Sequence, residues 1–495
     1  MSEWIKQAVF YHIYPIGFCG APTKNNEEPL QHRILKIKEL IPHLSECGIN
    51  AIYLGPVFES SEHGYDTKDY FKIDTRLGDE HSFKEVCDSL HEAGIKVVLD
   101  GVFNHVGREF WAFKDVQQKK WDSSYCDWFM NLNFNGHSPM GDDFWYEGWN
   151  GHYNLVKLNL RNPDVCDMLI KAVFYWMDTF HINGLRLDAA DVMDRDFFKR
   201  LRSEVKNKDP EFWLMGEVIH GDYKLWINDQ MLDSTTNYEC YKGLYSSHND
   251  ENYFEIAHSF NRQFSRGGIY EGIYLYNFTD NHDVNRLAST LRDESHLYNV
   301  YTLLFTMPGI PSIYYGSEMG IKGIKERWSD EPLRPCIPIE DFKMNELSRH
   351  IAKLAEIKKS SPALASMNYE QICIRNKQFV FKRSCEQETL FTAANLEHQE
   401  IPISFRFDEP LTDLLTMQTF EPENGQINII LEPTSAMILS NRQIEKVKIK
   451  NKITKEAKPQ QTYRFIEEIE SLDNHQIFYI YEDEQHHRYL SAKKF

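Results

Sequence analysis

Short apolar runs alternate with longer amphipathic segments over the first two thirds of the chain. The first such segment, Leu30–Glu46, carries apolar residues at helical spacing and is followed by Gly48, a typical helix-ending glycine. A second predicted helix, Ser82–Ala93, ends at Gly94. Each helix leads into an apolar run typical of a buried parallel strand, which is the rhythm of a (β/α)8 TIM barrel. The eight predicted strands are Val9–Tyr14, Ala51–Leu54, Lys96–Leu99, Gly184–Asp188, Phe212–Glu217, Ser234–Tyr238, Gly272–Phe278 and Ser312–Tyr315.

The rhythm stops after the third strand and changes again after a helix predicted at 346–359. We therefore predict a barrel at 1–105 and 164–360, with the inserted domain 106–163 containing five tryptophans. Short alternating segments then predict a C-terminal antiparallel β domain at 361–445. Residues 446–495 form a lysine-rich linker and an aromatic tail of unknown role, either a hairpin packed on the body or an attachment module.

Composition narrows the classes of partner. The net charge of −19 argues against nucleic acid or an anionic membrane. No apolar stretch approaches the ~20 residues that span a bilayer, and the first residues lack a signal-peptide pattern. The nine cysteines are odd in number and lack metal-type spacing, so we expect reduced thiols in a cytoplasmic protein.

Polar side chains follow four of the predicted strands. Asp100 begins a segment that ends at His105, Arg186 and Asp188 share one strand, Glu217 ends the next, and His282 and Asp283 follow the seventh. The C-terminal ends of barrel strands meet at one face, so these groups are expected to converge. Three carboxylates beside an arginine and two histidines fit glycosidic bond cleavage.

Taken singly, each residue leaves an alternative open. Arg186 and Asp188 are two residues apart on a strand, so their side chains point to the same side. The cation of Arg186 is expected to lower the pKa of Asp188 and keep it ionised, as a nucleophile requires. The alternative is an ordinary ion pair. Burial of Glu217 together with a nearby anion would raise its pKa, as a general acid requires; the alternative is a strand-end Glu that caps a helix or contacts solvent. Asp283 binds sugar hydroxyls or forms an Asx turn, and His105 is a sugar ligand or a loop hydrogen-bonder. Asp100 is expected to orient Arg186.

The order of these motifs resembles the α-amylase family, glycoside hydrolase family 13, from about Ala8 to Gly323. The resemblance implies Asp188 as nucleophile, Glu217 as general acid/base and Asp283 as transition-state stabiliser. It also implies that a set of six residues binds the sugar at the cleavage point: Tyr65, Asp66, His105, Arg186, His282 and Arg286.

Leu155–Asn159 and Gly216–His220 resemble the neopullulanase, cyclomaltodextrinase and maltogenic amylase group. The chain departs from that group at Ala189–Val192, and it begins directly at the barrel without the group's N-terminal β domain. Many family members hold calcium at the residue matching Asn104. The lysine-histidine pair of calcium-type members is replaced by Asp191 and Val192, so no cofactor is expected.

The sequence thus predicts a retaining hydrolase that cleaves α-1,4-glucosidic bonds of maltooligosaccharides or cyclodextrins. A transglycosylase or isomerase and an exo-acting α-glucosidase are alternatives on the same site. An alternative of another class is a non-catalytic sugar-binding subunit, which would be marked by loss of a catalytic carboxylate. Asp188, Glu217 and Asp283 are all present.

Overall fold

The computed structural model describes residues 2–26, 29–327 and 329–442, together with four strands of the C-terminal tail. The chain separates into two compact units, Met1–Asn441 and Arg442–Phe495. The strands of the second unit form one sheet in the order β22-β25-β24-β23. Their bounds are Ile453–Glu456 (β22), Arg464–Glu470 (β23), Ile477–Glu482 (β24) and Arg488–Ser491 (β25).

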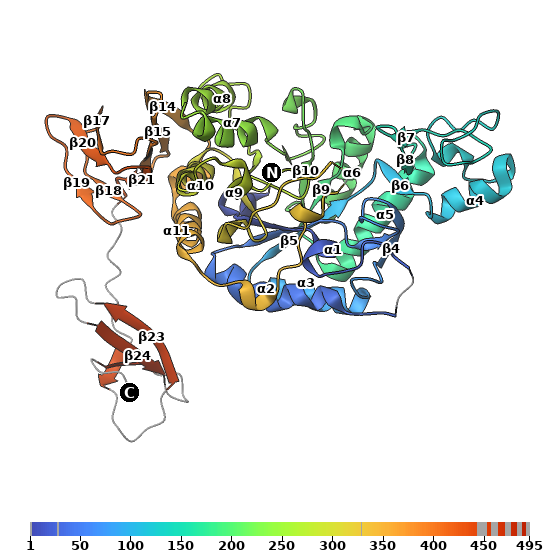
Figure 1. Ribbon diagram of the computed structural model, residues 1–495, viewed down its shortest axis with the longest axis horizontal. Coiled ribbons are helices and arrows are strands. Elements are labelled where there is room, and N and C mark those ends of the chain that lie inside the picture. Colours follow the sequence, from blue (N-terminus) through green and yellow to red (C-terminus); the bar gives the residue numbers. More distant parts are fainter. Residues whose placement is uncertain are drawn as a thin grey trace. The chain divides into compact units, whose positions relative to one another are not determined.

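Eight parallel strands form the barrel at the centre of the first unit (Figure 1). Neighbouring strands pair in parallel in the order β11-β10-β9-β5-β2-β1-β13-β12, and a parallel bridge between Thr236 and Tyr276 joins the two ends of this order. The predicted (β/α)8 fold is confirmed. The strands are β1 (Phe10–Ile13), β2 (Ala51–Leu54), β5 (Lys96–Gly101), β9 (Gly184–Leu187), β10 (Trp213–Gly216), β11 (Ser234–Thr235), β12 (Tyr276–Phe278) and β13 (Ile310–Tyr314).

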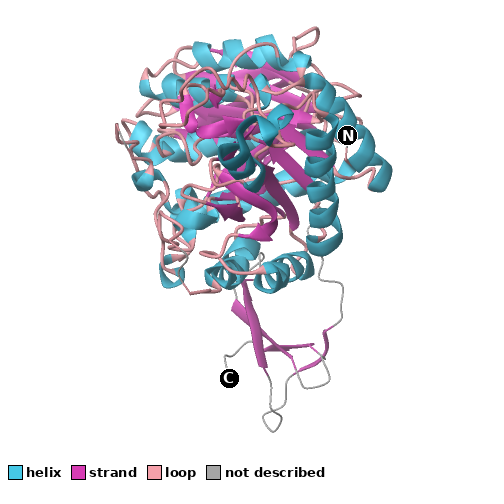
Figure 2. Ribbon diagram, turned by 90° about the vertical axis from the view of Figure 1, so that its right-hand side faces the viewer, coloured by secondary structure: helices cyan, strands magenta, loops and turns pink. Residues whose placement is uncertain are grey.

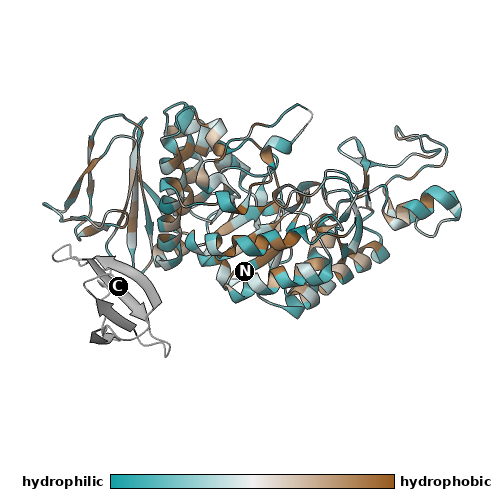
Figure 3. Ribbon diagram, turned by 60° about the horizontal axis from the view of Figure 1, so that its bottom comes forward, coloured by the Kyte–Doolittle hydropathy of each residue, from teal (hydrophilic) through white to brown (hydrophobic). Residues whose placement is uncertain are grey.

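The barrel strands are buried on both faces, which explains their continuous apolar runs. Alternate residues such as Phe10, Val98 and Trp213 pack in one core cluster, while their neighbours join a larger cluster with the helices. The helices surround the strands (Figure 2) and carry apolar and polar residues on different parts of their surface (Figure 3). The longer helices are α2 (Lys36–Glu46), α3 (Glu80–Glu92), α5 (Pro163–Phe180), α6 (Arg195–Lys208), α7 (Tyr238–Asn249), α8 (Phe254–Phe264), α10 (His296–Thr306) and α11 (Glu346–Ser360).

Two predicted strands are shorter than expected by at least three residues. The seventh was predicted from Gly272 but begins at Tyr276, because Gly272 has a φ of +77° and Ile273 N bonds Tyr270 O in a turn. The sixth was predicted to reach Tyr238. It stops earlier because the Asn237 side chain accepts a hydrogen bond from Cys240 N and caps α7.

The segment after the third barrel strand contains α4 (Trp111–Lys119) and a three-stranded sheet in the order β6-β8-β7. These strands are β6 (His105–Gly107), β7 (Gly148–Trp149) and β8 (His152–Lys157). Trp128 packs edge-on to Trp111 and so serves the segment's own core, whereas the Trp149 ring lies 5.5 Å from the His105 ring. The tryptophans of this segment thus contribute both to its own core and to the surroundings of His105.

Antiparallel strands lie at the end of the first unit opposite the inserted segment (Figure 1). They form one six-stranded and one two-stranded sheet, with Phe391, Ile429 and Leu439 in a shared core. The sequence missed β18 (Leu411–Asp413), β19 (Thr419–Phe420) and β20 (Gln426–Leu431), although β20 alternates strictly between exposed and buried residues. The other strands are β14 (Tyr369–Ile374), β15 (Gln378–Ser384), β16 (Thr389–Asn395), β17 (Ile401–Arg406) and β21 (Ser435–Ser440).

The finer domain division remains a prediction. The barrel, the segment 106–163 and the antiparallel sheets all belong to the first unit. Part of the linker predicted from 446 lies outside the described residues, and β22 lies within the remainder. Among the described helices, none combines the length and hydrophobicity needed to cross a bilayer.

Candidate active site

The Arg186 guanidinium, at the end of β9, lies between three carboxylates. Its Nη1 donates to both oxygens of Asp100 and to Oδ1 of Asp188, each at 2.9 Å. Its Nη2 lies 2.8 Å from Oε2 of Glu217. Arg186 is almost fully buried, so these are strong charge-assisted contacts. One cation therefore fixes the predicted nucleophile and the predicted general acid relative to each other.

The environment of Asp188 differs from the expectation based on Arg186 alone. Burial raises the pKa of Asp188 well above its usual range, Arg186 opposes this, and the charges of Glu217 and Asp100 add to the rise. The predicted lowering by Arg186 is present but is outweighed. The sequence could not show this because it did not reveal that three carboxylates share one cation.

Glu217 follows β10 and has two further contacts. Its Oε1 accepts a hydrogen bond from the Tyr238 hydroxyl at 3.2 Å, and its Oε2 accepts one from Ala189 N at 3.3 Å. Ala189 has a φ of +48°, which turns the chain directly after Asp188. The backbone turn that follows Asp188 thus helps to hold the Glu217 carboxylate.

Asp283 lies in a second cluster of charges. Its Oδ2 is 3.1 Å from Nε2 of His282, and its Oδ1 accepts a bond of 3.0 Å from Arg334. Burial raises the pKa of Asp283, but His282 and Arg334 outweigh it and hold the pKa well below its usual range. An Asx turn is present in this segment, but Asn281 makes it: its Oδ1 accepts from Asp283 N, and the contacts of the Asp283 carboxylate are with His282 and Arg334. The turn of Asn281 thus helps to position the Asp283 carboxylate.

Tyr65 and His105 complete the wall of the site. The Tyr65 hydroxyl contacts His282 Nε2, and the two rings stack with centroids 5.5 Å apart. His105 Nε2 lies 3.8 Å from Oδ2 of Asp188, and burial lowers the pKa of His105 to about 3, so its imidazole is neutral at pH 7. Asp66 is buried beside Tyr65, 3.7 Å from His63 Nδ1. The structure brings these three residues to the same face as the carboxylates.

Arg286 lies in the same region but faces inward. It is fully buried, and its guanidinium donates to the carbonyls of Tyr315 and Leu333 and stacks against Tyr314. These contacts give Arg286 a structural role in holding the loop after β13. Its predicted part in sugar binding stays a prediction.

Sequence reasoning missed two residues of the site. Arg334 contacts Asp283 and the His282 carbonyl, yet it follows no strand and belongs to no predicted motif. His12, on β1, stacks on Tyr53 with ring centroids 4.3 Å apart and meets His282 edge-on at 5.1 Å. The sequence could have indicated His12, because alternate residues of a barrel strand point into the barrel and His12 lies two residues after Phe10 on β1.

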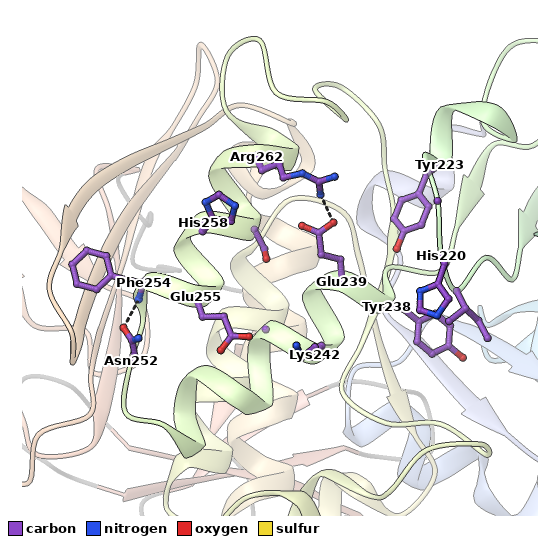
Figure 4. Close-up of a pocket in the computed structure, with 14 residues that line it drawn as sticks. His220, Tyr223, Tyr238, Glu239, Lys242, Asn252, Phe254, Glu255, His258 and Arg262 are labelled. Atoms are coloured by element: carbon purple, nitrogen blue, oxygen red, sulfur yellow. Dashed lines mark hydrogen bonds and ion pairs between the residues drawn. The ribbon is translucent and has the colours of Figure 1, made fainter.

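Two pockets flank these residues. One, of about 590 Å³, is lined by Tyr14, His63 and Arg334 and adjoins Asp283. The other, of about 840 Å³, is lined by Ile219 and Tyr238 and adjoins Glu217. Glu217 and Asp283 thus each contact a residue that lines a different pocket, Tyr238 in one case (Figure 4) and Arg334 in the other.

The residues near Asn104 do not fit calcium. In the described part of the chain, no group of three or more His, Cys, Asp and Glu side chains is placed to hold a metal ion. The small pocket beside Asn104 contains Arg161, whose Nε donates to Asp194 at 2.9 Å. A guanidinium there neutralises the carboxylate that a hard cation would need. The absence of a cofactor stays a prediction.

Comparison with known proteins agrees with this geometry. Residues 34–360 match the model of the α-amylase catalytic domain. The chain belongs to the α-amylase family. It is an α-amylase-family glycoside hydrolase, as the sequence predicted.

The similar proteins include cyclomaltodextrinases and maltogenic amylases. A cyclomaltodextrinase of a Bacillus species is 29% identical over 79% of this chain and 73% of its own length. The intracellular maltogenic amylase of Bacillus subtilis strain 168 is 29% identical over 88% of this chain and 77% of its own. A solved cyclomaltodextrinase structure superimposes with a TM-score of 0.78 at 26% identity, covering 88% of this chain and 78% of that one.

Proposed function

We propose that this chain hydrolyses α-1,4-glucosidic bonds of maltooligosaccharides and cyclodextrins with retention of anomeric configuration. The observation that carries the proposal is the single Arg186 guanidinium that holds both Asp188 and Glu217. Two carboxylates fixed so close together fit the short separation, about 5–5.5 Å, of retaining enzymes, which leaves no room for water between them. Relatives named cyclomaltodextrinase and maltogenic amylase support the substrate class.

The reaction proceeds in two steps. Asp188 attacks the anomeric carbon while Glu217 gives its proton to the departing oxygen, so a covalent glycosyl-enzyme forms as the sugar chain leaves. Glu217, now a carboxylate, takes a proton from water, and the water oxygen displaces Asp188. Asp283, held ionised by His282 and Arg334, stabilises the positive charge that develops on the sugar ring in the transition state of each step.

The pockets that adjoin Glu217 and Asp283 support cleavage within a chain over exo-acting release of glucose. Water and a second sugar compete for the same intermediate, so transglycosylation is a side reaction of this site. We also propose a cytoplasmic location, supported by the name of the Bacillus subtilis relative and by the dispersed free cysteines.

The decisive experiment compares wild type with Glu217→Gln and Asp188→Ala. Wild type should release mainly maltose and glucose from maltotriose and should open cyclodextrins, as measured by chromatography. Each substitution should lower kcat by several orders of magnitude, because Asp188 forms the covalent bond to the anomeric carbon and Glu217 transfers the proton. Near-normal turnover in Asp188→Ala would contradict the mechanism. Glucose alone from longer chains would favour the exo-acting alternative, and longer products would favour transglycosylation.

A further inference from the structure

One cysteine is placed for chemistry that the hydrolysis does not use. All nine cysteines lie in the described part of the chain, and all have free thiols. Five are buried, three are partly exposed, and Cys336 alone is exposed. Reaction with a dissolved reagent requires exposure, so Cys336 is the thiol that such a reagent meets first.

The Cys336 sulfur belongs to a cluster with an ammonium group and a second thiol. Nζ of Lys36, at the start of α2, donates to Cys336 Sγ at 3.2 Å and to Phe18 O at 2.7 Å. A cation beside a cysteine sulfur stabilises the thiolate, the form that attacks disulfides. Cys19 lies close by: burial raises its pKa to about 12, with a smaller raising contribution from Cys336. Cys19 therefore stays protonated, and Cys336 is the nucleophile of the pair.

A pocket beside Cys336 can hold an attached group. Cys336 lines the pocket of about 590 Å³ together with Tyr14, His63 and Arg334. This volume falls within the ~300–1,000 Å³ range of small-molecule sites. There is no such room toward Gly20, where a Cβ would be 2.9 Å from the Cys336 sulfur. A group bonded to the sulfur must therefore extend into the pocket.

The loop that carries Cys336 also holds the reaction site. Arg334, two residues earlier, donates to Asp283 Oδ1 and to the His282 carbonyl, both at 3.0 Å. The Arg334 backbone packs so tightly that a Cβ at Gly17 would be 2.2 Å from Arg334 O. The loop thus has no free space into which it can retreat. A group on Cys336 fills the pocket that adjoins Asp283 and presses on the arginine that holds this carboxylate.

The modification that fits this cluster is thiol–disulfide exchange. The Cys336 thiolate attacks one sulfur of a low-molecular-weight disulfide, a new S–S bond forms, and the S–S bond of the reagent breaks. Cys336 is oxidised, and the other half of the reagent is reduced and leaves as a thiolate that takes up a proton. A free thiol reverses the exchange by attacking the new bond.

The charges of the pocket indicate the class of reagent. Its lining carries both signs, with Lys24 and Arg334 as cations and Glu62 and Glu331 as anions. A small peptide disulfide presents ammonium and carboxylate groups, and each of these meets an opposite charge in the lining. A reagent with charges of one sign would meet repulsion as well as attraction.

We propose that Cys336 is a reversible modification site, at which a small peptide disulfide such as glutathione disulfide attaches its thiol half and blocks the pocket beside Asp283. Attachment follows from the cluster of Lys36, Cys19 and Cys336 and from the pocket. The loss of turnover that results from attachment depends on the proposed function. The enzyme is then active with a reduced Cys336 and inactive with a blocked one.

The test incubates reduced, folded wild type with glutathione disulfide. Intact mass should show one added glutathione, and peptide mapping should place it on Cys336. The modified enzyme should have a kcat/KM on maltotriose about 10–100-fold lower, the loss expected when a positioned group is displaced or its pocket is filled. Dithiothreitol should remove the adduct and restore activity to the same extent.

Three variants serve as controls. Cys336→Ser keeps an acceptor for Lys36, so it should have normal activity, take up no glutathione and remain active in the disulfide. Cys385→Ser, a partly exposed cysteine between β15 and β16, should be modified and inactivated like wild type. Lys36→Met should react several-fold more slowly at pH 7, because the ammonium beside the sulfur is gone.

The two readouts separate this inference from the proposed function. Absence of an adduct on Cys336 in folded wild type would overturn the inference. An adduct on Cys336 that leaves kcat/KM unchanged would overturn it too. Mass measurement needs no turnover, so a wild type that takes up glutathione at Cys336 but never cleaves maltooligosaccharides would overturn the proposed function and leave the modification site standing.

Discussion

The charge on Arg186 is divided among Asp100, Asp188 and Glu217. Asp100 is buried and accepts from both Arg186 and the Tyr53 hydroxyl, so it competes with the nucleophile for the same cation. Because of this competition, Arg186 offsets only part of the rise in pKa that burial causes at Asp188, and the pKa of Asp188 stays raised. The ionisation of the nucleophile thus depends on a residue that does not touch the reacting atoms.

Asp100→Asn tests this dependence. Removing one negative charge lowers the pKa of Asp188, because Asp100 is among the groups that raise it. The nucleophile acts as the anion, so activity falls as pH drops through this pKa, and the acidic limb of the kcat/KM profile should move to lower pH. The maximal rate should fall by about 10–100-fold, because Arg186 loses an orienting partner.

Tyr53→Phe is the control for this prediction. It removes the hydroxyl that donates to Asp100 at 2.7 Å but leaves every carboxylate in place. Its acidic limb should not move to lower pH. An acidic limb that moves upward or stays in place in Asp100→Asn would show that Asp100 does not control the ionisation of Asp188.

At the scale of elements, loops that follow barrel strands bring the site together by packing on one another. Gly107, at the end of β6, lies against the loop that carries Tyr65: a Cβ at this position would be 2.4 Å from Asp66 O. Gly107 has no positive φ, so the close approach alone explains the need for glycine. The inserted segment thus fixes the position of the loop that carries Tyr65 and Asp66.

Gly107→Ala should therefore impair the site more than the fold. The Asp66 backbone must move away, which displaces Tyr65 from His282, and we expect kcat/KM to fall about 10–100-fold, since small displacements of positioned groups cost that much. Gly267→Ala is the control: Gly267 has a φ of +80° and open space around it, so it should lower stability by about 1 kcal/mol and leave kcat/KM unchanged. Equal kinetics in the two variants would contradict the prediction.

The sequence predicted helices and strands well where the spacing of apolar residues follows one regular period. It predicted residues poorly where contacts between distant parts of the chain determine their position. Apolar runs identified all eight barrel strands, and their polar ends identified Asp188, Glu217 and Asp283. Arg334 escaped because it reaches the site from a loop between η7 (Ser317–Met319) and α11, at no strand end. The short strand β19 also escaped, because two residues carry no readable pattern. The pKa of Asp188 could not be read either, since it depends on burial and on distant carboxylates.

At the scale of the first unit, two buried cations lie where the barrel meets the antiparallel sheet. Lys358, on α11, donates to the carbonyls of Gly309 and Leu364, and Arg383, on β15, donates to the carbonyl of Thr306. Both side chains are fully buried. Burial lowers the pKa of Lys358 to about 7, with a further contribution from Arg383, and lowers that of Arg383 to about 9.

The junction should therefore make stability depend on pH. The unfolded chain binds the Lys358 proton with a pKa of ~10.4, whereas the folded chain binds it only below about 7. Between these values the unfolded state holds more protons, so the free energy of unfolding rises with pH. The cost of burying the ammonium is fully present below pH 7, at about 5 kcal/mol, and disappears near pH 10.4.

Lys358→Met separates this electrostatic cost from the hydrogen bonds. At pH 6.5 the substitution removes the cost and loses two bonds of about 1 kcal/mol each, so the variant should be about 3 kcal/mol more stable than wild type in denaturant unfolding. At pH 10 only the lost bonds remain, and the variant should be less stable. Lys353→Met, on the exposed face of the same helix, should show no such reversal. A loss of stability in Lys358→Met that is equal at both pH values would mean that the lysine stays charged in the fold. The junction would then act as a hydrogen-bonded anchor between barrel and sheet at every pH, with no titrating group.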